Sequence, residues 1–446
     1  TVKGDVLENR PVTSFEKALQ GQASGITVQA ASGQPGGAST VRIRGVGSFS
    51  ASSAPLYVLD GVPISAEDLT QSAQTASVLS AIDPRDIESV TVLKDATAAG
   101  LYGSRAANGV IVITTKKGKA GKSSINFSAN NGFSSIAVDR HDVMSGTEYF
   151  KYFWDYYYQT RITAGDNAAT AATVANDQTM DRLGLGARNG RPNMYNTYQP
   201  YNANGQLNAG VVQYYDTDWR DAVLRQGRTQ DYSISLSGGN DKTRFYLSGG
   251  YFEQKGITIA SDFKRYATKL NLENSATSFM KVGVNTTLAY TEQNTPPGAG
   301  GAANPIRFAE LVSGVYPLYA LDAQGVPVPD PSGNGLSYFY RTPVVLNYNP
   351  VGLSKKDIYN AKTVRGILSP YIDINIYKGL KFKTQGTIDF IDILETQYYN
   401  PVSGDGAAVG GRTYKFRPRD MTLTLTNMLS YTKGFGQSNI ELLAGQ

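Results

Sequence analysis

The chain has 446 residues, of which 41% are hydrophobic and only 18% are charged, and its formal net charge is +5. Gly (47) and Tyr (29) are abundant, which favours strands and turns and argues against both a helix-rich enzyme and a disordered chain. The small net charge argues against a nucleic-acid partner, and zero Cys with a single His excludes thiolate metal sites and most catalytic constellations. We therefore expect no enzyme activity, no cofactor and no metal site.

The N-terminal region is typical of a compact α+β unit. A short helix is expected after Ser14, which is a suitable N-cap. Asp60 and Gly61 predict a tight turn, because Gly tolerates a positive φ. Strands rich in β-branched residues are expected at 26–30, 41–45, 56–61, 87–95 and 109–116. The residue pattern changes near 116–122, where alternation of apolar and polar residues begins, so we divide the chain into domains at 1–121 and 122–446.

The second region alternates apolar and polar residues with a period of two. Nine such strands are expected, near 123–135, 231–239, 244–252, 265–273, 281–291, 371–377, 380–390, 421–431 and 438–445. The even connections between them are short, whereas the odd ones are mostly long, at about 136–228, 255–264, 294–363 and 395–418. A soluble sandwich explains the alternation equally well, but short turns on one rim and long loops on the other are typical of an outer-membrane barrel.

Polarity gives a second test of the barrel. In 380–390 the inward set would be Lys381, Lys383, Gln385, Thr387 and Asp389, and the outward set Leu380, Phe382, Ile388 and Phe390. Aromatic residues are expected at both membrane interfaces. They fall near the long-loop rim at Tyr232, Tyr251, Tyr266, Tyr290 and Phe390, and near the short-turn rim at Tyr377, Tyr431 and Phe435. No apolar run approaches the length of a membrane-spanning helix.

The strand count does not close a barrel. An unpaired edge is not tolerated in hydrocarbon, so we expect further strands beyond Gln446. A lumen that holds a domain of about 120 residues needs about 22 strands, so the whole protein would have roughly 900 residues.

Three segments of the first region, at 10–28, 41–64 and 82–119, resemble the plug domain of TonB-dependent outer-membrane transporters, specifically the SusC/RagA family of Bacteroidetes. Segments 235–257 and 263–285 resemble that family's early barrel strands more weakly. The plug signature is carried by Arg44, Gly45, Asp60, Gly61, Lys94, Asp95, Tyr102, Gly103, Arg105, Asn108 and Gly109.

This resemblance implies an α+β plug followed by an antiparallel transmembrane β-barrel in the bacterial outer membrane. It implies TonB-dependent active import of a nutrient, an oligosaccharide or a peptide. The implied partners are a SusD-like surface lipoprotein as lid, TonB with ExbB/ExbD at the periplasmic side, and outer-membrane lipid, with no nucleic acid.

Apical plug loops in such transporters touch the ligand, which makes 48–53 and 65–77 the candidate substrate loops. The candidate residues are Ser48, Phe49, Ser50, Ser52, Ser53, Ser65, Glu67, Asp68 and Gln71. Charged plug residues are a separate group that could pair with the barrel wall, where access of water would keep each pair weak. These are Arg42, Arg44, Asp86, Glu88, Asp95 and Arg105.

An aromatic cluster at 149–158 has two interpretations: its rings stack on sugars, or they pack as an amphipathic helix in the first extracellular loop or against the partner lipoprotein. Two other functions remain as alternatives to import. One is a non-transporting surface protein that keeps the fold as an adhesion or structural partner. The other is a secreted glycan-binding enzyme, which would need paired carboxylates, whereas the acidic residues here are scattered.

Overall fold

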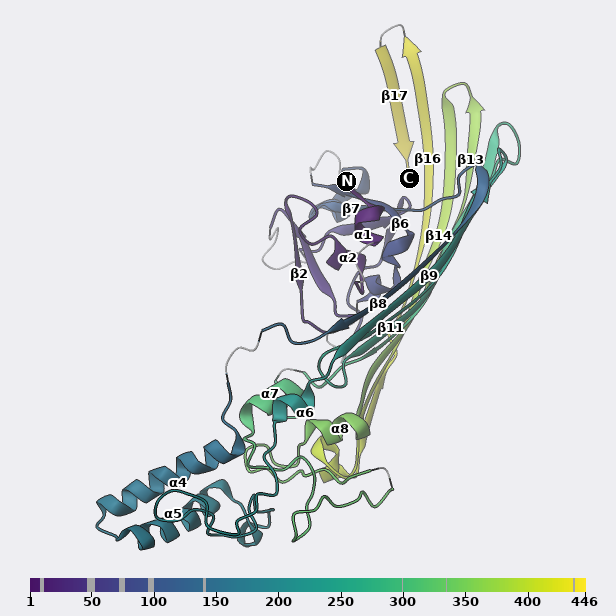
Figure 1. The fold of residues 1–446 in the computed structure, drawn as a ribbon. Coiled ribbons are helices and arrows are strands. Elements are labelled where there is room, and N and C mark those ends of the chain that lie inside the picture. The colour runs from purple at the N-terminus through teal and green to yellow at the C-terminus, as the bar shows by residue number, and fades with distance from the viewer. Residues whose placement is uncertain are drawn as a thin grey trace.

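The computed structural model describes residues 1–8, 12–45, 53–71, 77–94, 100–138, 142–298, 300–333, 335–435 and 438–446. Its N-terminal part is a small α+β unit, the plug, which lies against one face of a long curved antiparallel sheet (Figure 1). We call that sheet, β8 to β17, the wall. No helix within the described ranges is long and apolar enough to cross a membrane.

The plug contains a five-stranded sheet in the order β1-β6-β7-β4-β5 and a separate hairpin, β2-β3. Its strands are β1 (Val2–Lys3), β2 (Ile26–Ala30), β3 (Ser39–Ile43), β4 (Leu56–Leu59), β5 (Val62–Ile64), β6 (Ile87–Leu93) and β7 (Val110–Thr115). Its helices are α1 (Gly4–Glu8), α2 (Phe15–Ala18) and the 3-10 turns η1 (Val78–Ala81), η2 (Pro84–Asp86) and η3 (Gly100–Ala106). All five predicted strands are present, and β1 and β5 were not anticipated.

The turn between β4 and β5 is the predicted one. Asp60 and Gly61 have φ values of 49° and 91°, and Leu59 pairs with Val62 across them. Positive φ at both central residues is the geometry of the two-residue hairpin turn that matches strand twist.

Within the described residues the wall has ten strands, nine in sequential antiparallel order and β15, a short flap paired with the end of β14. The strands are β8 (Gly121–Ser134), β9 (Gly227–Gly239), β10 (Thr243–Lys255), β11 (Asp262–Asn274), β12 (Met280–Asn294), β13 (Ile358–Tyr377), β14 (Leu380–Tyr399), β15 (Arg412–Phe416), β16 (Arg419–Phe435) and β17 (Ser438–Gly445). Each of the nine predicted strands corresponds to one of these. The largest difference is β13, which begins 13 residues before the predicted start at 371.

The two faces of the wall alternate as predicted. On β14, Gln385, Thr387 and Asp389 are buried toward the plug, while Ile388 is exposed on the opposite face. The predicted aromatic row near the long-loop rim is also present, since Tyr232, Tyr251, Tyr266 and Tyr290 are neighbours across β9 to β12 with ring centroids 5.1–6.3 Å apart.

The long connections form a second folded region beyond one rim of the wall (Figure 1). Its helices are α4 (Gly146–Thr163), α5 (Ala168–Leu183), η4 (Ala187–Asn189), α6 (Trp219–Val223), α7 (Pro305–Leu311), α8 (Pro350–Lys356) and η5 (Gly404–Val409). Phe150 and Trp154 of α4 are buried in a hydrophobic cluster that includes Trp219 and Phe308. The aromatic segment 149–158 therefore packs as a helix within the first long loop, although Tyr152 and Tyr156 remain exposed.

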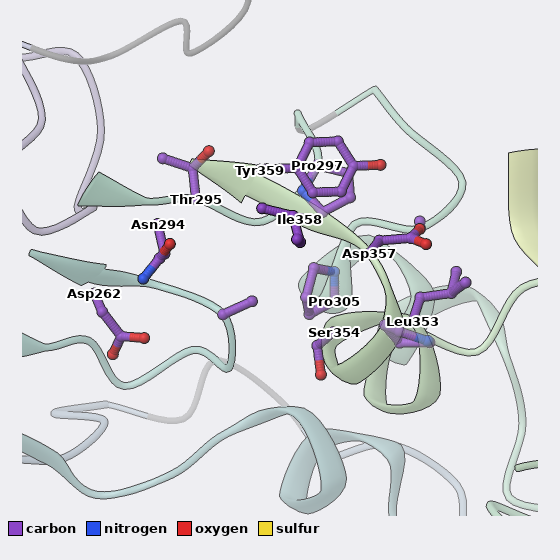
Figure 2. Close-up of a pocket in the computed structure, with 13 residues that line it drawn as sticks. Asp262, Asn294, Thr295, Pro297, Pro305, Leu353, Ser354, Asp357, Ile358 and Tyr359 are labelled. Atoms are coloured by element: carbon purple, nitrogen blue, oxygen red, sulfur yellow. The ribbon is translucent and has the colours of Figure 1, made fainter. Parts of the chain in front are cut away.

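A cavity of about 250 Å³ lies where this region joins the rim (Figure 2). Its polar lining includes Asp262 and Asn294 at the strand ends and Asp357 just before β13. Arg225 pairs with Asp262 at 2.6 Å, and Asn400 donates two hydrogen bonds to Asp357. Burial raises the pKa of Asp357. Prolines and Leu353 form much of the remaining lining.

The plug and the wall share one hydrophobic core. Phe15, Tyr57 and Leu79 of the plug belong to the same buried cluster as Ile367 of β13 and Ile391 of β14. The plug is therefore seated on the wall by apolar contacts as well as by the polar contacts described next.

Candidate functional site

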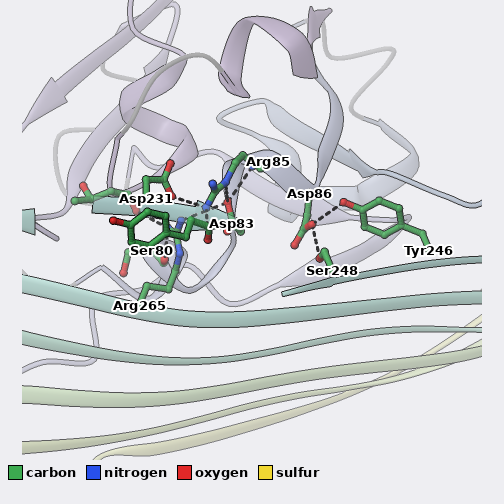
Figure 3. A network of polar contacts seen from close by, with 10 residues as sticks. Ser80, Asp83, Arg85, Asp86, Asp231, Tyr246, Ser248 and Arg265 are labelled. Carbon is green, nitrogen blue, oxygen red and sulfur yellow. Dashed lines mark hydrogen bonds and ion pairs between the residues drawn. The ribbon is translucent and has the colours of Figure 1, made fainter. Parts of the chain in front are cut away.

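The interface between plug and wall holds a buried polar network that joins the two parts (Figure 3). It begins at η2, in the segment Ile82–Ile87. Asp83 is the N-cap and accepts a hydrogen bond from the Arg85 backbone N–H at 3.0 Å, and Pro84 occupies the first helical position, where its missing N–H costs nothing. This turn projects Asp83, Arg85 and Asp86 toward the wall.

The docking cluster, as we call this network, consists of Asp83, Arg85 and Asp86 of the plug with Asp231, Tyr246, Ser248 and Arg265 of the wall (Figure 3). Arg265 reaches Asp83 at 3.4 Å, and Arg85 forms ion pairs with both Asp83 and Asp231. Burial alone would raise the pKa of Asp83, but Arg265 and Arg85 hold it below its usual value.

Asp86 meets hydroxyls rather than a cation. Tyr246 Oη donates to its carboxylate at 2.9 Å and Ser248 Oγ at 2.6 Å. Burial, and then the charge of Asp83, raise the pKa of Asp86. Of the six charged plug residues considered as wall partners, Asp86 therefore contacts the wall through neutral groups. Arg85 and Asp83, which were not among the six, form ion pairs with Asp231 and Arg265 of the wall.

Arg265 also holds the plug backbone. Its Nη1 donates to the carbonyl of Thr13 at 2.9 Å and to that of Ser80 at 3.2 Å, so one side chain joins the segments before α2 and at η1. A glycine opposite makes the approach possible, because a Cβ on Gly250 would lie 2.5 Å from Asp83 Oδ2.

A second docking point is centred on Arg365 of β13. Its guanidinium and the Asp389 carboxylate form a two-bond pair at 3.1 and 2.8 Å, and both side chains are only about 2% exposed. Arg365 also donates to the carbonyls of Val78 and Ser65, and the Ser65 N–H donates to Asp389 at 3.1 Å. Planar bidentate pairing of this kind is the strongest hydrogen-bonded arrangement of a carboxylate.

A third docking point lies where the plug chain passes into the wall. Asp60 accepts hydrogen bonds from the N–H and hydroxyl of Thr115, and its carboxylate is 3.6 Å from Lys269 Nζ. Asn271 donates to Thr115 Oγ1 and to the carbonyl of Lys116. The signature residue Asp60 thus ties the β4–β5 turn to both the end of β7 and the wall.

The other signature residues have structural positions. Gly103 and Gly109 have positive φ, and a Cβ on Gly109 would lie 2.8 Å from Ile43. Lys94 donates to the Ser24 carbonyl, and Asn108 to that of Ala54. Arg44 and Gly45 have positive φ values of 58° and 101°, and Tyr102 packs on Leu56 and Val110. Arg105 is exposed, and Asp95 lies outside the described residues.

The predicted substrate residues separate into two groups. Ser48, Phe49, Ser50 and Ser52 lie outside the described residues, and Ser53 is half-buried just after them. In the second loop, Ser65 is bound to Arg365 and Asp389 through its backbone, and the Gln71 N–H donates to Glu395 at 2.8 Å. Glu67 and Asp68 are exposed between them. The segment from Ser65 to Gln71 therefore follows β14 toward the long-loop rim.

Sequence reasoning did not identify Arg265, Lys269 and Arg365, the three wall cations that bind the plug at the three docking points. A signal was present, because all three occupy inward positions of strands whose opposite face is apolar. In the part of the chain that the structure describes, no group of three or more acidic or His side chains could hold a metal ion.

Comparison with known proteins shows which proteins this chain is similar to. Residues 1–110 match the model of the TonB-dependent Receptor Plug Domain. The whole chain is 30% identical to TonB-dependent receptor P3 of Formosa agariphila and spans 37% of it. A match to TonB-dependent receptor SusC of Bacteroides thetaiotaomicron covers 61% of the chain and 22% of that protein at 34% identity. Structures of the RagAB peptide importer in the "closed-closed" and "open-open" states align with the entire chain at a TM-score of 0.73, with 26% and 27% identity.

The SusC/RagA resemblance is thereby confirmed. The chain spans 46% of the aligned RagAB chains, so it contains a SusC/RagA-type plug and part of a barrel wall. TonB-dependent receptors are outer-membrane β-barrels, and the predicted outer-membrane location is confirmed with the fold.

Proposed function

We propose that this chain belongs to a transporter that imports a nutrient across the outer membrane by TonB-dependent movement of the plug. We also propose the division into a plug at 1–121 and the N-terminal part of a transmembrane β-barrel at 122–446, which includes both the wall and the long loops. The observation that carries the import proposal is the chemistry of the interface, where the plug is held at three docking points by hydrogen bonds and ion pairs from wall side chains.

A polar interface suits a plug that must detach and return. When an interfacial hydrogen bond breaks in a lumen that water can enter, water replaces the lost partner, so the net cost is only about 1 kcal/mol per bond. A wholly apolar interface of the same size would expose its surface to water with no such replacement. The docking points therefore position the plug firmly but leave it removable by an external pull.

We propose TonB, energised with ExbB/ExbD, as the source of that pull, and a SusD-like lipoprotein as the lid above the long loops. The relatives support these proposals: they are TonB-dependent receptors, SusC among them, and RagAB is a peptide importer by its title. The loop region supplies a broad folded surface beyond the rim on which a lid could rest.

For the substrate we propose an oligosaccharide or a peptide that passes the segment Ser65–Gln71. The rim cavity supports a ligand with neutral donor groups, because two carboxyls, and no Lys or Arg among the described residues, line it. The alternative is a non-transporting outer-membrane partner that keeps the plug fixed, and it differs in one measurable respect: its plug need not move.

A reversible cross-link separates these alternatives. Because the chain has no Cys, the pair Asp86→Cys and Ser248→Cys introduces one disulfide between plug and wall at a contact of 2.6 Å. Uptake of native ligand, identified by mass spectrometry of the purified complex, should stop on oxidation and return on reduction.

The matched control is Ser235→Cys with Ser248→Cys, which joins two directly paired wall residues and leaves the plug free. Uptake by this control should be unaffected by oxidation. Full uptake with the plug cross-linked to the wall would reject import by plug movement.

A further inference from the structure

Glu16 is a carboxyl buried in the core of the plug without an ion pair among the described residues. It lies in the first turn of α2 and is 2% exposed. Tyr57 Oη donates to Glu16 Oε1 at 3.4 Å, while Oε2 has no hydrogen-bond partner in the described part of the chain. The hydroxyls of Thr13 and Ser14 are also buried there without partners. Three unsatisfied polar atoms within four residues are unusual for a packed core.

These residues lie directly behind a docking point. Arg265 of the wall binds the carbonyl of Thr13, three residues before Glu16, and the carbonyl of Ser80 in η1. Ser77, the N-cap of η1, is close enough to affect the ionisation of Glu16. The carboxyl therefore lies between α2 and η1, the two segments that a single wall arginine holds together.

The protonation state of Glu16 decides whether its site holds an unpaired charge. The neutral acid carries no charge, whereas the carboxylate places a negative charge in the plug core, where Glu16 has no ion pair among the described residues. Burying the charged form without a cation is costly. Burial raises the pKa of Glu16 to about 7, against the opposing effects of Ser14, Tyr57, Lys17 and Ser77. Burial also keeps the pKa of Tyr57 well above its usual value, so its hydroxyl remains a donor.

We propose that Glu16 is a proton-sensitive latch of the plug: as the neutral acid it allows α2 and η1 to pack together under Arg265, and as the carboxylate it loosens that packing. The latch would make the proposed import dependent on pH. Only the biological role of the latch rests on the proposed import. Because the folded-state pKa is raised above its usual value of 4.5, the stabilisation is complete at acid pH and is lost as the pH rises toward 7.

The test is hydrogen exchange of the full chain in lipid nanodiscs, followed in peptides covering 12–20 and 77–82 at pH 5.5 and 8.0. After correction for intrinsic exchange, local opening in the wild type should increase roughly 20-fold between the two values. Glu16→Gln should abolish this increase, since the amide does not ionise. The infrared difference spectrum of wild type minus Glu16→Gln should show a carboxylic acid band at pH 5.5 that is lost at pH 8.0.

Two further variants keep the test decisive. Glu88→Gln removes an exposed plug carboxyl and should retain the full pH response. Tyr57→Phe removes only the donor to Glu16 and should move the transition to higher pH, which reports on the latch even if Glu16→Gln folds poorly. An unchanged pH response in Glu16→Gln, or an unmoved transition in Tyr57→Phe, would overturn the proposal. Exchange is measured without transport, so loss of the import hypothesis would leave this result intact.

Discussion

At the scale of single residues, two wall arginines hold the plug through the same set of contacts. Arg265 and Arg365 each bind a carboxylate and two plug carbonyls, and both are almost completely buried. The five N–H donors of a guanidinium allow one side chain to satisfy all of these acceptors at once. A lysine has the charge but not the planar fork, so the two residue types are not interchangeable at these positions.

Arg265→Ala should weaken plug docking strongly, because it leaves buried Asp83 without one of its two cations. The expected loss is up to about 3–5 kcal/mol, with Arg265→Lys intermediate. The pKa of Asp83 is held low, so the contribution is present at neutral pH and is lost as the pH falls through that lowered value. Calorimetry of plug unfolding at pH 7 and over a series of decreasing acid pH values measures both effects. Equal stability of wild type and Arg265→Ala at pH 7 would contradict this account.

Gly250→Ala should also disturb docking, because the new Cβ would lie 2.5 Å from Asp83 Oδ2. Asp83 cannot easily move, since it caps η2 and binds both arginines, and overpacking of this kind costs about 1–3 kcal/mol. The adjacent Gly249→Ala is the control, because its Cβ meets only Ile234, at 4.0 Å. Plug protection from protease, compared between the two variants, tests the prediction, and equal protection would refute it.

At the scale of elements, the start of α4 anchors the first long loop. Ser145 and Glu148 form a capping box, and Asp216 accepts from the backbone N–H groups of Gly146 and Thr147. The helix N-terminus is therefore fixed by a carboxylate 70 residues away in sequence, which closes the loop on itself.

Asp216→Ala should loosen the α4–α5 hairpin by about 1–2 kcal/mol, the usual effect of losing an N-cap acceptor. Hydrogen exchange of residues 146–183 should increase while that of the wall is unchanged. Asp155→Ala, which removes an exposed partner of Lys151, is the control and should have little effect. Comparable exchange in the two variants would show that Asp216 does not hold the hairpin.

The elements were predictable to different degrees, for physical reasons. Period-two alternation located nine of the ten wall strands because one face meets lipid and the other meets water or plug, and it missed the short flap β15. The first 13 residues of β13 were missed because Gly366 and Pro370 disfavour a strand locally, and pairing with β12 and β14 overrides them. The docking contacts were not predictable, since parity shows that Arg265 points inward but not which plug atoms it meets.

At the scale of the whole molecule, the outward face of the wall should determine assembly in the membrane. Leu247→Arg places a charge at the middle of β10 on the lipid side and should cost about 2–4 kcal/mol of folding free energy. Val326→Arg makes a similar change at an exposed loop position and should be neutral. Heat-modifiable mobility on gels reports correct insertion, and normal insertion of Leu247→Arg would argue against this orientation.

The link between plug and wall limits how the plug can travel. Only residues 116–120 separate the end of β7 from the start of β8, and five extended residues span at most about 18 Å. Asn271 restricts this linker further, because it donates hydrogen bonds to Thr115 and Lys116. The C-terminal end of the plug is thus a fixed hinge. A pull from the opposite end would swing or partly unfold the plug about this point, and we expect β1, joined to β6 by two residue pairs, to detach first.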